Sequence, residues 1–194
     1  MRHEFRIEGE AFALRPVELG DSEFIAQLRN DPRLGRFIHA GSRNAREQGA
    51  WLQEYFEREG DYYFTIVDQR SGAPEGTVAI YDVDARKDTG EWGRWVLRPG
   101  SLAATESTLL LYRVGFDRLN LDTIYCRTVA ANEAVVSFHD SAGLVRAGIL
   151  PAHVRLAGKA HDCVEHRATR ENWPRIEANL APVASMIAGR LLRA

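Results

Sequence analysis

The stretch that decides the fold spans residues 91–144 and reads EWGRWVLRPGSLAATESTLLLYRVGFDRLNLDTIYCRTVAANEAVVSFHDSAGL. Its pattern predicts a strand over residues 91–97, a Pro/Gly/Ser break, a helix over residues 105–119 and a second strand over residues 123–129. Asn132 then opens a further helix. A crossover helix makes its two strands parallel and leaves its first backbone N–H groups beside the end of the first strand. Such an arrangement suits an anionic phosphate.

Hydrophobic periodicity places further elements on both sides of this stretch. A short strand, two helices and a hairpin are expected before it, and two strands and a terminal helix after it: residues 12–15, 21–31, 44–60, 62–67 with 76–81, 144–147 with 162–168, and 175–192. We therefore predict an α+β fold: a mixed, mostly antiparallel sheet with one parallel, splayed pair, flanked by helices. Crevices at such splayed points usually hold ligands.

Two details of side-chain placement follow from simple periodicity. Strand alternation over residues 91–97 predicts two faces: Glu91, Gly93 and Trp95 on one, and Trp92, Arg94 and Val96 on the other. In the helix over residues 105–119, we expect Leu109, Leu110 and Val114 to be buried and Glu106 to face water. Ser101 and Thr105 are the candidate helix caps.

Composition indicates an ordinary globular protein. The chain has 194 residues, of which 45% are hydrophobic and 27% charged, and its formal net charge is −2. We expect one domain over residues 1–194 with an additional C-terminal helix at about residues 175–192. The apolar side chains of that helix suit packing on the domain's own core or on a second subunit of a homodimer, and both alternatives stay open.

Charge, cysteine content and apolar runs restrict the partners. Intermixed acidic and basic residues argue against nucleic acid as the main partner. Cys126 and Cys163 are too few for a disulfide framework and lack a metal-binding spacing. We find neither an apolar run of signal-peptide length at the start nor an apolar run of about 18 residues. We therefore expect a cytoplasmic protein without a membrane partner.

Residues 11–173 resemble the GNAT superfamily of N-acetyltransferases, and more narrowly its RimJ/RimL-like branch. The resemblance rests on the opening LRP followed by Asp21, on residues 104–144 and on the closing HVRLAGKAHDCVEHRATRENW. WGRWV and SFHDSAGL look most like the members that acetylate nucleotide-linked amino sugars. The resemblance implies a single acyltransferase domain that uses acetyl-CoA as co-substrate.

The resemblance also implies where acetyl-CoA is held. The backbone of Trp95, Val96 and Leu97 is expected to pair with the pantetheine arm, and Asn132 to hydrogen-bond it. The pyrophosphate loop of the family usually reads Arg/Gln-x-x-Gly-x-Gly/Ala, but here the segment is shorter. Its candidate cofactor-binding residues are Arg98, Gly100, Ser101, Ala103 and Ala104. For Asn132, a plain N-cap remains a second interpretation.

Two residues are candidates for proton transfer. Glu91 matches a position where family members often carry a general base, and a surface carboxylate at a strand start is the alternative. His139 falls where many members carry a Tyr that protonates the sulfur of CoA. The alternatives for His139 are a structural histidine or a contact to CoA without proton transfer.

The resemblance places the closing hairpin over the acceptor. His153 and Asp162 are the candidate substrate contacts there, with incidental loop residues as the alternative. Tyr81 and other aromatic residues suit an acceptor pocket, although Trp51 is expected to belong to the core. The histidine spacing in this hairpin is unsuited to zinc, so no metal is expected.

Together these features predict transfer of an acetyl group from acetyl-CoA to a primary amine of a small molecule, with a nucleotide-linked amino sugar as the leading acceptor. Protein N-terminal and antibiotic acetyltransferases are alternatives within this class. A non-catalytic GNAT-fold module that binds an acyl-CoA or a protein is the alternative from another class, supported by the shortened loop.

Overall fold

The computed structural model describes residues 3–84, 86 and 88–193. These residues form one eight-stranded sheet with the strand order β1-β2-β3-β4-β5-β6-β8-β7. The strands are β1 (Ile7–Glu8), β2 (Phe12–Pro16), β3 (Tyr62–Asp68), β4 (Pro74–Asp84), β5 (Thr89–Leu97), β6 (Thr123–Val129), β7 (Val145–Leu156) and β8 (Lys159–Thr169). All neighbouring pairs are antiparallel except β5 and β6. The predicted α+β fold with one parallel pair is confirmed.

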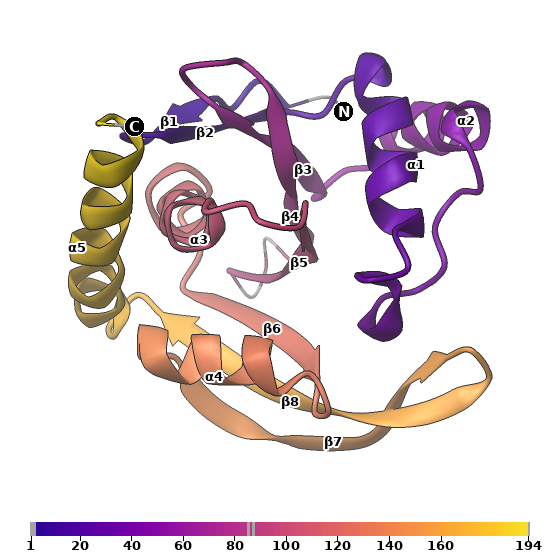
Figure 1. Cartoon of the computed structure of the whole chain (residues 1–194). Helices are drawn as coiled ribbons and strands as arrows, with labels where there is room; N and C mark the ends of the chain where they lie inside the picture. The colour runs from indigo at the N-terminus through magenta and orange to yellow at the C-terminus, as the bar shows by residue number, and fades with distance from the viewer. Residues whose placement is uncertain (1–2, 85, 87, 194) are drawn as a thin grey trace.

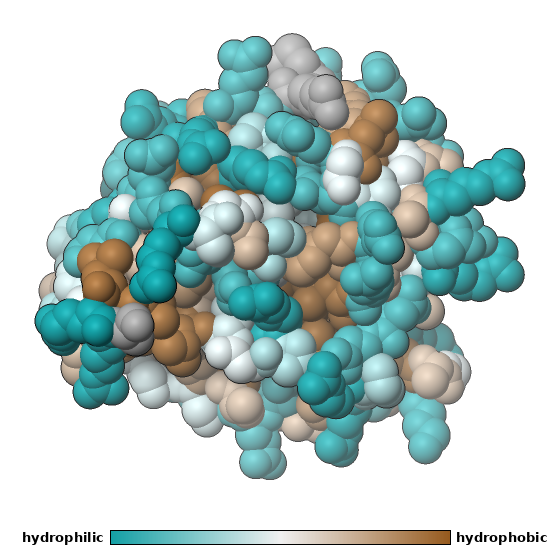
Figure 2. All heavy atoms as spheres, turned by 45° about the horizontal axis from the view of Figure 1, so that its top comes forward, coloured by the Kyte–Doolittle hydropathy of each residue, from teal (hydrophilic) through white to brown (hydrophobic). Residues whose placement is uncertain are grey.

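Helices cover both faces of the sheet (Figure 1). They are α1 (Ser22–Asn30), α2 (Ala45–Tyr55), α3 (Ala104–Arg113), α4 (Glu133–Ala142) and α5 (Trp173–Leu191), with short turns η1 (Leu19–Asp21) and η2 (Gly35–Phe37) and the π-helical turn η3 (Val114–Arg118). Alternation along β3 divides the core, because Tyr63 packs with α1 and α2 whereas Phe64 packs with α3 and α5. The surface is largely hydrophilic, with apolar side chains visible in a hollow (Figure 2).

The start of α3 differs from the prediction. Its N-cap is Ala103, which makes no side-chain cap hydrogen bond, so capping by Ser101 or Thr105 is wrong. Glu106 does not face water either: it is buried, and its carboxylate accepts hydrogen bonds from the backbone N–H groups of Glu10, Ala11 and Phe12. A buried carboxylate needs such donors. Glu106 therefore holds the β1–β2 turn onto the helix.

The hairpin of β7 and β8 is much longer than the sequence pattern indicates. Most residues of β7 are exposed, so the strand lacks the apolar alternation by which a half-buried strand is predicted. Its pairing with β8 runs from Val145 opposite Arg167 to Leu156 opposite Lys159. Phe37, in the connection between α1 and α2, packs against the far end of this hairpin.

Candidate active site

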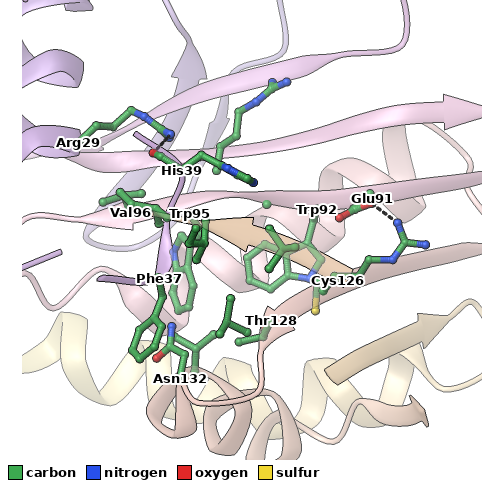
Figure 3. Close-up of a pocket in the computed structure, with 18 of the residues that line it drawn as sticks. Arg29, Phe37, His39, Glu91, Trp92, Trp95, Val96, Cys126, Thr128 and Asn132 are labelled. Carbon is green, nitrogen blue, oxygen red and sulfur yellow. Dashed lines mark hydrogen bonds and ion pairs between the residues drawn. The ribbon is translucent and has the colours of Figure 1, made fainter. Parts of the chain in front are cut away.

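A cleft opens where β5 and β6 part. The two strands pair only at Thr89, Gly90 and Glu91 on the β5 side, although β5 continues to Leu97 and β6 to Val129. The cleft has a volume of about 690 Å³, and both separated strands line it (Figure 3). A splayed parallel pair leaves backbone groups without a strand partner, which suits an extended ligand. The splay is therefore where the sequence predicts it.

A β-bulge interrupts β5 inside the cleft. Thr77 lies opposite Val96 but Ala79 lies opposite Gly93, so β5 carries one extra residue there. Arg94 has φ +49°, and its carbonyl accepts a hydrogen bond of 2.9 Å from the Thr77 hydroxyl.

The bulge overturns the predicted alternation along β5. Trp92 and Trp95 share the face of α3 and α4, with ring centroids 5.5 Å apart. Glu91 and Arg94 share the opposite face, where both contact Tyr81. The prediction that Trp95 lies on the side of Glu91 is wrong because an extra residue reverses the parity of a strand.

Glu91 is a buried carboxylate at the point of the splay. One oxygen accepts a hydrogen bond from the Tyr81 hydroxyl at 3.2 Å, and the other lies 2.9 Å from Nη1 of Arg127. Burial is the largest influence and raises the pKa of Glu91, while Arg127 and Tyr81 lower it in part. Burial also raises the pKa of Tyr81, which therefore stays protonated and donates. A carboxylate with a raised pKa inside a cleft suits proton transfer.

Around Glu91 lies a group of side chains that we call the charged wall: Asp61, Tyr81, Glu91, Arg94 and Arg127. Two further ion pairs hold its arginines. Arg94 donates to both oxygens of Asp61, at 2.5 and 2.8 Å, and its guanidinium lies over the rings of Trp51, Tyr63 and Tyr81. Arg127 reaches Glu91 and also Glu165 of β8, at 3.0 Å.

Sequence reasoning missed Asp61, Arg94 and Arg127 as site residues. Asp61 and Arg94 stand 33 positions apart, and Glu91 and Arg127 36 positions apart. No local spacing signals such pairs. Trp51, expected in the core, is half-buried and lines the cleft while stacking on Tyr55.

The predicted cofactor residues lie at the opposite end of β5. Trp95 and Val96 line the cleft, whereas Leu97 pairs with Gly76 and packs into the core. The indole N–H of Trp95 points to Ser107 of α3, at 3.3 Å. The structure therefore brings the strand expected to bind pantetheine and the start of α3 together.

Residues 98–103, which we call the α3 loop, lie beyond the lining of the cleft and lead to Ala104 at the start of α3. Gly100 has φ +84°, a conformation that favours glycine. The Arg98 side chain is half-exposed and already paired with Glu75, Nη2 to Oε1 at 2.5 Å. The Ser101 hydroxyl accepts the backbone N–H of Ala103. The groups that this segment offers to an anion are therefore mainly the backbone N–H groups in the first turn of α3.

Asn132 begins α4 but does not cap it with its side chain. Its carbonyl instead accepts the first helical N–H groups, from Val135 and Val136. The side chain lines the cleft and faces the same space as Trp95 and Phe37 (Figure 3). A plain N-cap role for this side chain is wrong, and its amide is available to a ligand.

His139 lies deep among aromatic rings. Trp92 packs edge-on against it at 5.1 Å between centroids, and the His166 ring lies at 5.2 Å. Burial, and secondarily the neighbouring His166, lowers the pKa of His139 to about 3. The imidazole is therefore neutral near pH 7, which removes the imidazolium form that the predicted acid role requires. Its Nδ1 has no hydrogen-bond partner among the described residues.

Of the two substrate contacts predicted in the hairpin, His153 lies at the cleft and Asp162 does not. His153 lines the cleft, as Glu91 does. Asp162 does not line it: its carboxylate accepts the backbone N–H of Ala152 at 2.8 Å and so stabilises the irregular part of the hairpin. Within residues 3–84, 86 and 88–193, no group of His, Cys, Asp and Glu has the arrangement of a metal site.

The arrangement of a splayed parallel strand pair beside a helix start is accompanied by a match to a known protein family. The family model described as "Acetyltransferase (GNAT) domain" matches residues 12–145, which is more than half of the chain. The chain belongs to the GNAT acetyltransferase family. Members of this family generally use acetyl-CoA as co-substrate. Membership supports N-acetyltransferase activity.

Solved structures share the GNAT fold of this chain. FdhC without ligand, a nucleotide-linked sugar GNAT, has a TM-score of 0.77 and 27% identity over 92% of this chain and 98% of that chain. A mutant of the spermidine N-acetyltransferase SpeG from Vibrio cholerae has a TM-score of 0.74 and 19% identity over 85% of this chain and 97% of that chain. At that lower identity, the likeness shows the fold alone. None of the curated protein sequences matches this GNAT chain.

Among the described residues of this GNAT chain, no helix combines the length and apolarity needed to cross a bilayer.

Proposed function

We propose that the protein transfers an acetyl group from acetyl-CoA to a primary amine of a small molecule, by direct attack in a ternary complex. The observation that carries this proposal is the position of Glu91. This buried carboxylate with a raised pKa shares one cleft with the splayed backbone of Val96. Acyl transfer to an amine needs a proton acceptor beside a place for the thioester.

The roles in this reaction follow from the geometry. Glu91 accepts the proton of the bound ammonium, directly or through a water molecule, and its raised pKa brings it closer to that of an amine. The backbone N–H of Val96 or Leu97, in the part of β5 that has separated from β6, stabilises the negative charge on the thioester oxygen. The amine nitrogen then bonds to the acetyl carbon as the carbon–sulfur bond breaks, and the thiolate of CoA takes up the proton that the nitrogen loses as the amide forms.

Asn132 and the first turn of α3 hold acetyl-CoA in this proposal. The cleft-facing Asn132 amide suits the polar groups of the pantetheine arm. His139, neutral and buried, borders this arm and shapes its apolar surroundings rather than supplying a proton as imidazolium.

The acceptor that we favour is a nucleotide-linked amino sugar, within the RimJ/RimL-like branch. The cleft lining contains three guanidinium groups and, as its acidic member among the described residues, Glu91. Carboxylates pair with Arg94 and Arg127, and the remaining cation, Arg29, suits an acceptor that carries phosphate and disfavours a polyamine. FdhC, a nucleotide-linked sugar GNAT, is similar at 27% identity. A protein N-terminus or an aminoglycoside-like amine brings no such anion.

One observation favours a second candidate, a non-catalytic module. The α3 loop is short, and its cation Arg98 is already bound to Glu75. If the loop fails to hold a pyrophosphate, the cleft serves as a binding site for another acyl-carrying ligand or a protein segment.

Thermal unfolding in the presence of CoA and of acetyl-CoA separates the two candidates. We expect both ligands to raise the melting temperature, because a ligand that binds the folded state well above its Kd stabilises it. No stabilisation by either ligand at millimolar concentration contradicts the enzyme. Where CoA binds, thiol release across a panel of amines tests transfer, and release without acetylated amine would indicate hydrolysis alone.

A further inference from the structure

The three guanidinium groups that line the cleft differ in whether a carboxylate neutralises them. Arg94 is bound by both oxygens of Asp61, and Arg127 lies between Glu91 and Glu165. Arg29 has no carboxylate partner among the described residues. Its one hydrogen bond there runs from Nη2 to the carbonyl of His39, at 2.9 Å. Within the part of the chain that the structure describes, the cleft therefore holds one uncompensated guanidinium.

The backbone holds this guanidinium in place. Arg29 lies in the last turn of α1, and the connection to α2 folds back over its side chain. A Cβ atom added at Gly41 would stand 2.8 Å from Nε of Arg29 and 3.0 Å from its Cβ. The absence of a side chain at Gly41 thus lets the chain approach the arginine closely. One bond to His39 leaves most of the five N–H donors of a guanidinium for a ligand.

The position of Arg29 indicates which part of a ligand it meets. Arg29 and His39 lie at one end of the cleft, and Glu91 lies at the other (Figure 3). An α-amino acid carries its carboxylate next to its amine, which suits a cation beside Glu91 rather than one at the other end of the cleft. A nucleotide-linked sugar carries its diphosphate away from an amine on the sugar ring, and planar guanidinium groups bind phosphate oxygens well.

We infer that Arg29 is a specificity-determining residue that binds the diphosphate of the acceptor while the acceptor's amine approaches Glu91. This inference rests on the proposed function and adds the residue that selects an anionic acceptor. It differs from a purely structural role, in which Arg29 only holds the carbonyl of His39 and balances the C-terminal end of α1.

Calorimetric titration of the CoA-saturated protein tests the inference without depending on turnover. Saturating CoA keeps the probe out of the cofactor's own pyrophosphate site. The probes are UDP, uridine as its phosphate-free counterpart, and glycine as an amine with an adjacent carboxylate. The variants are Arg29→Gln, which keeps a donor for the carbonyl of His39 but removes the charge, and Arg29→Lys, which keeps the charge. Arg33→Gln, on the same connection but paired with Asp31 and exposed, is the control.

We expect wild type and the Arg33→Gln control to bind UDP more tightly than uridine. Arg29→Gln should weaken UDP binding about tenfold or more while changing uridine binding less than about twofold, because a charge-assisted hydrogen bond is lost. Arg29→Lys should retain part of the preference. Melting temperature and CoA affinity should be unchanged in all three variants.

Each other outcome overturns the inference. Equal binding of UDP by wild type and Arg29→Gln assigns Arg29 a structural role. If the variants lose CoA affinity, Arg29 binds the cofactor. If glycine binding depends on Arg29 and UDP binding does not, Arg29 binds a carboxylate. Failure of the proposed function looks different: UDP still binds in an Arg29-dependent manner, but no amine is acetylated.

Discussion

The charged wall and the α3 loop lie toward opposite ends of β5 and are built in opposite ways. In the wall, the buried carboxylates of Asp61 and Glu91 pair with arginines from distant parts of the chain, Arg94 and Arg127. The α3 loop is short, largely exposed, and holds one half-exposed cation that Glu75 already binds. The difference teaches that the wall is preorganised for chemistry, whereas the loop depends on its ligand and on backbone N–H groups.

The largest effect should come from removing the carboxylate of the wall. Glu91→Gln keeps the shape of the side chain but cannot accept a proton, so kcat/KM for the amine should fall about 100- to 1,000-fold. CoA affinity, measured by calorimetry, should stay within experimental error. Glu177→Gln, which alters a partly exposed pair with Arg113 on the other side of the core, is the matched control. Unchanged turnover in Glu91→Gln would remove the carboxylate from the reaction.

Breaking the second pair of the wall should affect stability. Asp61→Asn leaves the guanidinium of Arg94 buried beside three aromatic rings without a counter-charge. The free energy of unfolding, measured by urea titration, should fall by about 3 kcal/mol because one partner of a buried pair is removed. Asp31→Asn, whose partner Arg33 is exposed, should change the free energy of unfolding much less. Similar losses in both variants would show that the wall is not preorganised.

The lowered pKa of His139, which lies on the cofactor side of β5, predicts that the stability of the protein depends on pH. Its folded pKa of about 3 lies below the ordinary 6.5, so the unfolded chain binds the proton first as the pH falls. Its contribution is complete above pH 6.5 and is lost progressively between pH 6.5 and 3. His139→Gln should remove about 2 kcal/mol of the decrease in unfolding free energy between pH 6.5 and 5.

Urea titrations at pH 6.5 and 5 measure this difference, and His161→Gln on the outer hairpin controls for the substitution itself. Burial also lowers the pKa of His3, and that contribution is common to all three proteins. If wild type and His139→Gln lose stability in parallel, the imidazole is not kept neutral by the fold.

The smallest effect should come from the α3 loop. Arg98→Gln should weaken CoA binding by no more than about threefold, because exposed ion pairs contribute little and this guanidinium already has a partner. Competition calorimetry with CoA measures the change. A loss greater than tenfold would mean that the loop relies on a side-chain charge, and the contrast with the wall would disappear.

Much of the fold was predictable because its signals are local. The β3–β4–β5 meander, the crossover through α3 and the ends of α4 follow from apolar periodicity, Asn120 and Gly143. The length of β7 was not predictable, since most of its side chains are exposed. Burial of Glu106 was hidden too, because its three N–H donors belong to a turn almost a hundred positions away.

The residues of the candidate site also divide into those that the sequence could predict and those that it could not. The splay, Glu91 and the cleft-facing Asn132 were accessible because they follow from the order of elements. Arg127 was missed, since only the parting of β5 and β6 reveals that its guanidinium reaches Glu91. The neutral state of His139 was missed because its pKa depends on rings contributed by separate elements.

The bulge at Arg94 changes which face of the sheet the odd-numbered side chains of β5 occupy. Before it, odd-numbered positions such as Glu91 face the charged wall, whereas Trp95 beyond it faces α3 and α4. Deletion of the extra residue itself would remove the bulge and leave Trp95 and Leu97 on their present face, whereas deletion of a residue outside the bulge would turn one end of the strand over. Which face of the sheet a substitution in β5 affects must therefore be worked out separately for the residues before and after Arg94. A deletion within β5 but outside the bulge should therefore be far more damaging than loss of the extra residue.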